Sequence, residues 1–192
     1  MLKTEFIEFI YRNKIMKLGT VQLKNGDYSD HIYDFGVVDS PDQLSRLAMW
    51  LVDMIDDIEF DAIFTSAYKG IALTTAIALE YHIRFPTKKI RTGYVRKERK
   101  DHGEGGNVVG YTPRKGDRVL LLDDVITTGG SQFEMLDFVK AFGARPVLVL
   151  VAINRADDKL FASIQQKVQV PIHFITTDKE ITSVFHDFWG KK

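Results

Sequence analysis

One segment near the middle of the chain limits its possible folds more than any other. It reads Arg118-Val-Leu-Leu-Leu-Asp-Asp-Val-Ile-Thr-Thr-Gly-Gly-Ser131, which is an apolar run, two carboxylates and a turn of small residues. The apolar run predicts a buried strand, and the residues from Ser131 to Phe142 predict a helix that Gly143 closes. A strand that passes through a short turn into a helix is typical of α/β folds with a parallel sheet.

The turn itself carries groups that suit a phosphate monoester. Thr127, Thr128, Gly129, Gly130 and Ser131 offer backbone amides, hydroxyls and the positive end of the helix dipole. The glycines allow close approach of the backbone and positive φ. Neither a GxxxxGK nor a GxGxxG pattern is present, which excludes a Walker loop and a dinucleotide-binding turn.

The two acids, Asp123 and Asp124, end the predicted strand, where ligands of open α/β sheets bind. Adjacent carboxylates at such a place can accept hydrogen bonds from vicinal hydroxyls, such as those of a ribose. The alternative is an ordinary strand-turn-helix in which the acids cap the helix. The complete order of apolar run, two acids and small-residue turn favours the sugar-phosphate site.

The remaining sequence alternates short apolar strands with helices. Two apolar runs, Val21 to Leu23 and Ile32 to Val38, flank Asn25-Gly26 and predict a hairpin or tight bend. One long irregular segment runs from Lys97 to Gly116. The pattern predicts an α/β fold with a mainly parallel central sheet flanked by helices. We expect helices at about 4–17, 41–55, 70–82 and 131–142, near 161 and at the end to 188, and strands at 62–65, 93–96, 118–123, 147–154 and 172–176.

Composition limits the partners and the compartment. A chain of 192 residues with 45% hydrophobic residues suits a single domain over 1–192. Basic and acidic residues number 26 each, which gives no general attraction to nucleic acid or membranes. Cysteine is absent, which excludes disulfides and a thiolate nucleophile and suits the cytoplasm. The longest apolar run, Val147 to Ile153, is far below the roughly 20 residues that span a bilayer.

The segment from Arg118 to Ser131 resembles the phosphoribosyl pyrophosphate (PRPP) signature of the type I phosphoribosyltransferases. The resemblance implies their fold, including a small N-terminal hood region. It implies that the turn holds the 5′-phosphate and the acids the ribose hydroxyls. Magnesium is the implied cofactor, held chiefly by PRPP and reached by the acids mainly through water. The residues implied to bind PRPP here are Asp123, Asp124, Val125, Ile126, Thr127, Thr128, Gly129, Gly130 and Ser131.

A second segment, Tyr94-Val-Arg-Lys-Glu-Arg-Lys-Asp-His-Gly-Glu-Gly-Gly106, crowds basic residues into a glycine-containing loop. Fixed cations there could stabilise a departing pyrophosphate, whereas a basic run by itself is more often a solvated surface. The loop resembles the RKExKDHGEGG segment of orotate phosphoribosyltransferases nearly letter for letter. The resemblance implies a homodimer in which each loop closes over the neighbouring subunit's site. It also implies that Arg96, Lys97, Lys100 and His102 bind PRPP, with Lys100 and His102 nearest the reacting pyrophosphate.

Two further matches complete the implied site. Thr65-Ser-Ala-Tyr-Lys-Gly70 is similar to the family's pyrophosphate-binding loop, which implies Lys69 as a ligand and a cis peptide between Ala67 and Tyr68. Without the resemblance, Lys69 could be a surface residue at a helix start, where the dipole disfavours a cation.

The second match concerns the base. Leu23-Lys-Asn-Gly26 with Ser29 to Gly36 is similar to the family's LKSG…SPxYFxxG, and a lysine and an arginine suit the carboxylate of orotate, although either could be surface charge. Asn25, Asp30 and Ile32 stand where the family usually has serine, proline and an aromatic residue, which predicts a smaller stacking surface. The residues implied to contact orotate are Lys24, Ile32, Tyr33, Thr127 and Arg155.

Together these resemblances imply transfer of ribose 5-phosphate from PRPP to orotate, giving orotidine 5′-monophosphate and pyrophosphate, a step of pyrimidine synthesis. One alternative is a phosphoribosyltransferase for another base, which would not require the RKERKDHGEGG loop. The other is a non-catalytic regulator that binds PRPP without turnover. We expect no nucleic-acid or membrane partner.

Overall fold

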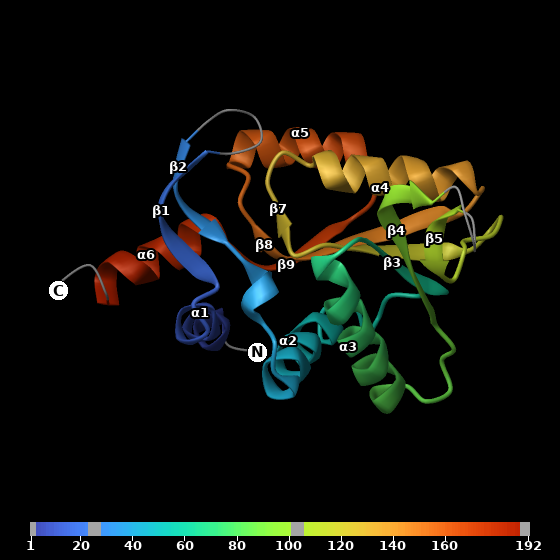
Figure 1. Ribbon diagram of the computed structural model, residues 1–192, viewed down its shortest axis with the longest axis horizontal. Coiled ribbons are helices and arrows are strands. Elements are labelled where there is room, and N and C mark those ends of the chain that lie inside the picture. Colours follow the sequence, from blue (N-terminus) through green and yellow to red (C-terminus); the bar gives the residue numbers. More distant parts are fainter. Residues whose placement is uncertain (1–2, 23–27, 101–105, 189–192) are drawn as a thin grey trace.

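The computed structural model describes residues 3–22, 28–100 and 106–188, and these residues form a central sheet of seven strands (Figure 1). Every neighbouring pair of strands is parallel except β4 and β5. The short β7 (Val125–Ile126) pairs with the last two residues of β8. The other strands follow the order β5 (Gly106–Gly110), β4 (Arg91–Lys100), β3 (Ala62–Ser66), β6 (Arg118–Leu122), β8 (Arg145–Asn154) and β9 (Ile172–Thr177).

Helices cover both faces of this sheet, as the sequence predicted (Figure 1). Because side chains alternate along a strand, Leu120 and Leu122 of β6 enter one apolar core, and Val119 and Leu121 enter the other. The first core lies against α1 (Lys3–Arg12), α2 (Pro41–Val52), α3 (Lys69–Arg84) and α6 (Asp178–Phe188). The second lies against α4 (Gly130–Ala141) and α5 (Asp158–Val168).

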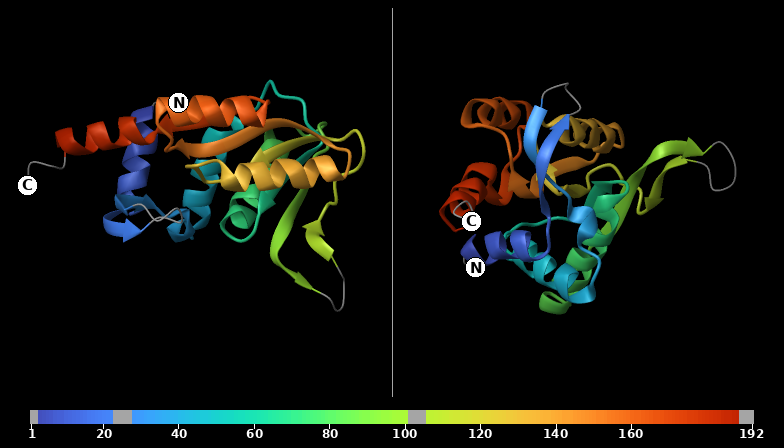
Figure 2. Two further views of the ribbon diagram at one scale, coloured as in Figure 1. Left: turned by 90° about the horizontal axis from the view of Figure 1, so that it is seen from above. Right: turned by 60° about the vertical axis from the view of Figure 1, so that its left-hand side comes forward.

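The N-terminal hood consists of α1 and an antiparallel pair, β1 (Met16–Gln22) and β2 (Tyr28–Tyr33), and Figure 2 shows this pair standing apart from the main sheet. Aromatic packing fixes α1 on α2, because the ring of Trp50 meets those of Phe6 and Phe9 edge-on. The start of α2 is held by a capping box between Ser40 and Gln43. The hood is thereby anchored to the core that supports the sheet.

Several boundaries differ from the sequence expectations. The first helix ends at Arg12, not near Lys17, because Met16 already pairs with Tyr33 in the hood sheet. The second helix ends at Val52, although Ile55 is still buried as expected. The Asn25-Gly26 turn lies outside the described residues.

The segment from 97 to 116 is not irregular throughout, so that prediction was wrong in part. Strand β4 continues to Lys100, and β5 returns beside it in an antiparallel arm (Figure 2). Val95 lies opposite Val108, and this cross-strand apolar pair supports the arm. In the described part of the chain, no helix has the length and apolar character needed to cross a bilayer.

Candidate active site

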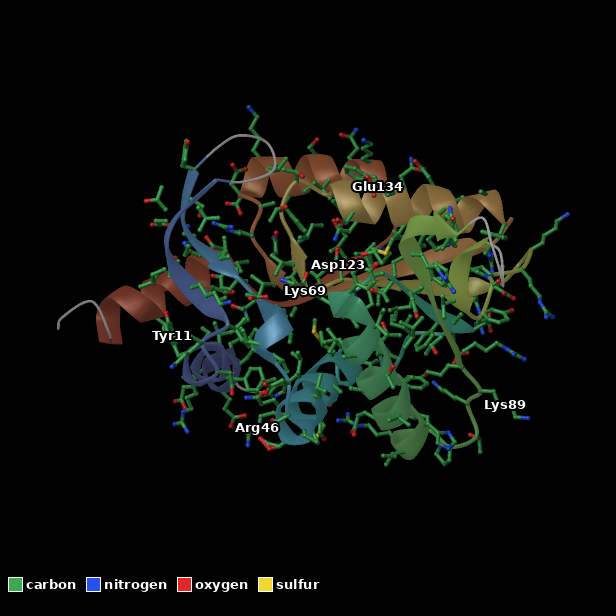
Figure 3. The ribbon with its side chains drawn as sticks, viewed as in Figure 1. Tyr11, Arg46, Lys69, Lys89, Asp123 and Glu134 are labelled. Carbon is green, nitrogen blue, oxygen red and sulfur yellow. The ribbon has the colours of Figure 1, made fainter. Side chains whose placement is uncertain are left out.

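A cleft of about 310 Å³ opens at the carboxyl ends of β3 and β6, the edge of the sheet where the sequence placed the site. Lys69 and Asp123 face this region from α3 and from the end of β6 (Figure 3). The cleft brings together segments that are far apart in the sequence. Its walls are Ile32, Tyr33, Ser66, Ala67, Tyr68, Lys69, Gly70, Asp123, Asp124, Val125, Thr127, Ser131 and Arg155.

The two acids are held by their own backbone and by α4. Asp123 Oδ1 accepts from the Asp124 amide at 3.0 Å, and Asp123 Oδ2 accepts from Gln132 Nε2 at 2.7 Å. Asp124 Oδ1 accepts from the Val125 amide at 2.8 Å. Burial raises the pKa of Asp124, and the charge of Lys69 opposes this effect. These bonds fix the orientation of both carboxylates in the wall of the cleft.

The turn after the acids leads directly into α4, which begins at Gly130, one residue earlier than expected. Gly129 is the N-cap with φ of 81°, and no side chain caps this helix end. A Cβ at Gly129 would lie 2.8 Å from the ring of Phe133, so glycine is required there both by φ and by space. The first amides of α4 remain available to an anion, as the phosphate prediction requires.

Within the turn, the predicted residues differ in what they can offer. Thr127 and Ser131 line the cleft, as does Val125. The side chain of Ile126 is fully buried in the core under α4, so only its backbone can meet a ligand. Thr128 completes the connection from β7 to α4.

Lys69 is the first residue of α3 and already has an anionic partner within the chain. Its Nζ lies 2.7 Å from Asp34 Oδ1, while Lys17 Nζ lies 2.6 Å from Asp34 Oδ2. These two bonds, from Lys17 and then from Lys69, hold the pKa of Asp34 well below its usual value. The loop before Lys69 contains the predicted cis peptide between Ala67 and Tyr68.

Close packing fixes the position of this loop. Gly70 packs so closely on β3 that a Cβ there would lie 1.9 Å from Thr65 Oγ1. The loop and the start of α3 are therefore pressed against the end of β3, which sets where Lys69 enters the cleft.

Arg155 and Tyr33 also line this cleft. The backbone amide of Arg155 donates to the Ile126 carbonyl at 2.9 Å, which places this residue beside the turn. Its Nη2 donates to the hydroxyl of Ser29 and, at 3.0 Å, to the carbonyl of His31, both on β2. Burial, and then the nearby carboxylate of Asp178, raise the pKa of Tyr33, so its ring is neutral at physiological pH.

A second cleft of about 330 Å³ shares Ser66, Ala67 and Ser131 with the first and contains Arg96 from β4. Arg96 Nε is buried and has no hydrogen-bond partner among the described residues. A buried donor without a partner is costly, and an anionic ligand would remove that cost. Larger clefts of about 510 and 600 Å³ lie between α1 and α2 and beside α3, and neither contains a predicted site residue.

The structure describes no side chain for four of the predicted residues. Lys97 and Lys100 lie on β4, and their side chains fall outside the description. His102 and Lys24 lie outside the described residues altogether. Of the remaining predicted residues, the structure gathers Ile32, Tyr33, Lys69, Asp123, Asp124, Val125, Thr127, Ser131 and Arg155 in one cleft and Arg96 in the adjoining one.

Sequence reasoning missed three polar residues near these clefts. Asp34 meets Lys69 across 35 residues, and no spacing pattern reveals such a contact. Gln132 follows the recognised turn by one residue and could have been found by asking what holds Asp123. Glu134, one helical turn after Gly130, lines the second cleft beside Arg96 and is labelled in Figure 3.

Comparison with known proteins identifies the family of this chain. The model of the phosphoribosyl transferase domain matches residues 38–189. An orotate phosphoribosyltransferase of Vibrio vulnificus is 42% identical over 157 residues, which cover 80% of this chain and 71% of that protein. The crystal structure of the Francisella tularensis orotate phosphoribosyltransferase superimposes with a TM-score of 0.75 and 29% identity, covering 95% of this chain and 90% of that one.

A more distant structure shares the fold. The orotate phosphoribosyltransferase of Mycobacterium tuberculosis, described in complex with PRPP, has a TM-score of 0.70 at 17% identity, covering 94% of this chain and 98% of that chain. At this identity the likeness concerns the fold alone. The family match and the 42% identical relative carry the assignment: this chain belongs to the phosphoribosyltransferase family and groups there with the orotate phosphoribosyltransferases.

Proposed function

We propose that this protein transfers ribose 5-phosphate from PRPP to orotate and that the cleft between the acid pair and Arg155 is where the transfer occurs. The observation that carries the proposal is the convergence of the acids, the uncapped start of α4, Lys69 and Arg155 on one cleft. The products are orotidine 5′-monophosphate and pyrophosphate, which places the reaction in pyrimidine synthesis. Its relatives at 38–42% identity carry the orotate phosphoribosyltransferase name.

The 5′-phosphate binds at the start of α4. The turn from Thr127 to Ser131 offers amides that no side chain caps, together with the hydroxyls of Thr127 and Ser131 in the cleft wall. The helix dipole adds to the attraction for a dianion. These groups bind the phosphate without a charged side chain, so the sugar stays attached throughout the reaction by contacts that do not change during the chemistry.

The acids hold the ribose. Asp123 and Asp124 lie at the mouth of the same turn, and their bonds with Gln132 and the Val125 amide fix their orientation. Magnesium fits this arrangement, because two adjacent carboxylates beside a diphosphate suit an ion that keeps several waters. Asp123 and Asp124 would hold it mainly through water, and the ion would neutralise charge on the pyrophosphate. The described residues contain no group of three or more acidic, His or Cys side chains that could hold a metal.

Lys69 and Arg96 are the described cations that would bind the departing pyrophosphate. Lys69 and Arg96 lie in the two adjoining clefts, and the unpartnered Nε of Arg96 supports this assignment. As the bond from C1 of the ribose to the pyrophosphate oxygen breaks, a ring nitrogen of orotate forms the new bond to C1 and loses its proton, which the released pyrophosphate takes up. Positive charge develops on the ribose and negative charge on the leaving group, so fixed cations lower the barrier. Lys97, Lys100 and His102 would add to this stabilisation from the arm.

Orotate binds between the hood and the turn. Arg155 faces its carboxylate, and Ile32 and Tyr33 present apolar surface to its ring, with Thr127 at the sugar side. Lys24 is the further cation assigned to this site. The neutral ring of Tyr33 and the small Ile32 give less stacking surface than two aromatic rings, which agrees with the departures noted in the sequence.

A homodimer is the proposed assembly, with the arm of each subunit at the site of the other. An apolar stripe on α3 supports it: Leu79 and Ile83 are 61% and 74% exposed, one helical turn apart. Analytical ultracentrifugation tests this assembly. We expect a sedimenting species with twice the chain mass of 21.9 kDa. A cytoplasmic location is proposed on the absence of cysteine from the sequence.

The test of the proposed function is the ultraviolet absorbance of orotate incubated with protein, PRPP and magnesium, with adenine, guanine, hypoxanthine and uracil as alternative bases. We expect PRPP-dependent loss of orotate and no comparable reaction of the other bases. In a Lys100→Ala variant, turnover should fall about 100-fold while PRPP binding changes much less, because this cation acts mainly on developing charge. Turnover of another base, or PRPP binding with no turnover of any base, would contradict the proposal.

A further inference from the structure

We propose that Asp178 is a positioning residue for orotate, because it holds Tyr33 and Arg155 in the arrangement that the base requires. The inference rests on the proposed assignment of these two residues to orotate binding. Asp178 is the first residue of α6 and does not line the cleft, so it acts through the residues that do. Nothing in the motifs points to it, since it lies 145 residues from Tyr33.

One carboxylate oxygen meets three side chains, and two of them, Tyr33 and Arg155, are assigned to the base site. Asp178 Oδ1 accepts from the hydroxyl of Tyr33 at 2.7 Å and lies 2.6 Å from His31 Nε2. Arg155 Nε lies 3.9 Å from the same oxygen. The His31 and Arg155 side chains are only 7% and 13% exposed, so these contacts are shielded from water and count for more than surface pairs.

His31 extends the network on its other side. Its Nδ1 lies 2.6 Å from Asp30 Oδ1, so the ring lies between two carboxylates, one at each ring nitrogen. The backbone carbonyl of His31 accepts from Arg155 Nη2. Strand β2, the residue after β8 and the start of α6 therefore meet at Asp178, and the hood is tied to the far end of the chain.

The consequence for the base site is a preset geometry. Arginine has several rotatable bonds, and fixing its guanidinium before the substrate arrives removes an entropic cost from binding. Nη2 of Arg155 already donates to Ser29 and to the His31 carbonyl on β2, and Nε faces Asp178. Nη1 makes no hydrogen bond with any described residue. This leaves Nη1 for the carboxylate of orotate. The hydroxyl of Tyr33 is likewise held on Asp178, so its ring rather than its polar tip is presented to the cleft.

Asp178→Asn tests the proposal with Asp30→Asn as its matched control. Both carboxylates lie 2.6 Å from a ring nitrogen of His31, but the Asp30 side chain is 93% exposed and makes no hydrogen bond with Tyr33 or Arg155 among the described residues. We expect Asp178→Asn to raise the KM for orotate about tenfold, as for loss of one charge-assisted contact, with the KM for PRPP within about twofold. Asp30→Asn should leave both KM values within about twofold.

A structural role alone would give a different result. If Asp178→Asn lowers the melting temperature and leaves the KM for orotate unchanged, the proposal is overturned. Tyr33→Phe removes one bond to Asp178 and keeps the ring, so it provides a second, milder variant, with an expected rise of about threefold in the KM for orotate. No change in that variant together with none in Asp178→Asn would likewise contradict the proposal.

Arg155→Leu separates this inference from the assignment on which it rests. We expect this variant to raise the KM for orotate strongly. Adding Asp178→Asn to it should then change this KM very little, because both changes remove the same positioned cation. If Arg155→Leu leaves the KM for orotate unchanged, the base site itself is wrongly assigned. If Arg155→Leu has its effect and Asp178→Asn has none, only the positioning role fails.

Discussion

At the level of single residues, cations of the cleft are held by carboxylates of the chain itself. Lys69 lies 2.7 Å from Asp34, and Arg155 lies 3.9 Å from Asp178. The two carboxylates have different consequences. If Lys69 binds the pyrophosphate as proposed, Asp34 competes with the substrate for this amine. Asp178 instead faces Nε of Arg155, and Nη1 stays available to the proposed base.

Replacement of Asp34 tests this competition. Asp34→Asn keeps the shape of the side chain and removes its charge, so Lys69 becomes more available to a diphosphate. We expect PRPP to bind about threefold more tightly, measured by isothermal titration calorimetry, which is the scale of a partly exposed ion pair.

The opposite change provides the control. Lys17→Gln removes the other cation on Asp34, which leaves that carboxylate to Lys69 alone, so PRPP should bind slightly less tightly. Weaker PRPP binding by Asp34→Asn would show that Asp34 supports the site rather than competing with its ligand.

The sequence identified most residues of the cleft, because they belong to contiguous motifs. Asp123, Asp124 and Thr127 come soon after one apolar run, and Lys69 lies within the recognised loop from Thr65 to Gly70. Asp34 and Asp178 could not be found in this way, since their partners lie 35 and 145 residues away and pair with them only after folding. The contacts that position the motif residues can therefore be found only from the structure.

At the level of elements, the turn into α4 depends on its first glycine and much less on its second. Gly129 has φ of 81° and no room for a Cβ, whereas a Cβ at Gly130 meets nothing closer than 3.9 Å. Gly129→Ala should lower the free energy of unfolding by about 2 kcal/mol or more, from left-handed strain and overpacking together.

Gly130→Ala is the matched control, and we expect a change within about 0.5 kcal/mol. Urea denaturation of both variants measures the difference. Equal stability of the two variants would contradict the requirement for glycine at position 129.

The start of α6 gives a prediction about pH. Thr177 and Glu180 form a reciprocal cap, with the Thr177 amide 2.9 Å from Glu180 Oε2 and the Glu180 amide 3.2 Å from Thr177 Oγ1. Burial acts to raise the pKa of Glu180, but its bonds with Lys3 and with Thr177 and Thr176 outweigh this and lower it from 4.5 to about 2. Because the folded pKa is depressed, its stabilisation is present above pH 4.5 and lost as the pH falls toward 2.

Glu180→Gln should therefore be less stable than the natural chain at pH 7, by about 1 kcal/mol after allowance for the exposed ion pair with Lys3. The difference should shrink as the pH falls from 4.5 and vanish near pH 2. Thermal melts of both proteins across this range measure it, and a difference that stays constant with pH would rule out the charge of Glu180 as its cause.

The boundaries of elements with a strong apolar pattern were predicted within a few residues. The boundaries of elements without such a pattern were predicted less well. β3, β6 and β8 consist mainly of buried apolar residues, and the predicted strands match them closely. The end of β4 reads Arg96-Lys97-Glu98-Arg99-Lys100, which has no apolar alternation that would predict a strand. The pairing of Lys100 with Gly106 of β5 marks where this strand ends. For the same reason, Met16 was assigned to a helix although the hood sheet recruits it.

At the level of the whole molecule, the fold brings four distant regions to one edge of the sheet. The carboxyl ends of β3 and β6 supply the loop before Lys69 and the two acids. The residue after β8 is Arg155, and the hood supplies Ile32 and Tyr33. The parallel connection of the strands explains this arrangement, because all their carboxyl ends face the same side. The hood then covers that side, and Asp178 ties it in place.

The most direct test of the central claim is the initial rate of PRPP-dependent orotate loss in the natural chain and in Asp124→Asn. The account predicts turnover by the natural chain and a loss of about 100-fold or more in the variant, because the carboxylate proposed to act on the ribose loses its charge. The melting temperature should be retained, because the asparagine oxygen can still accept from the Val125 amide. Orotate turnover that persists unchanged in Asp124→Asn would contradict the assignment of this cleft as the active site.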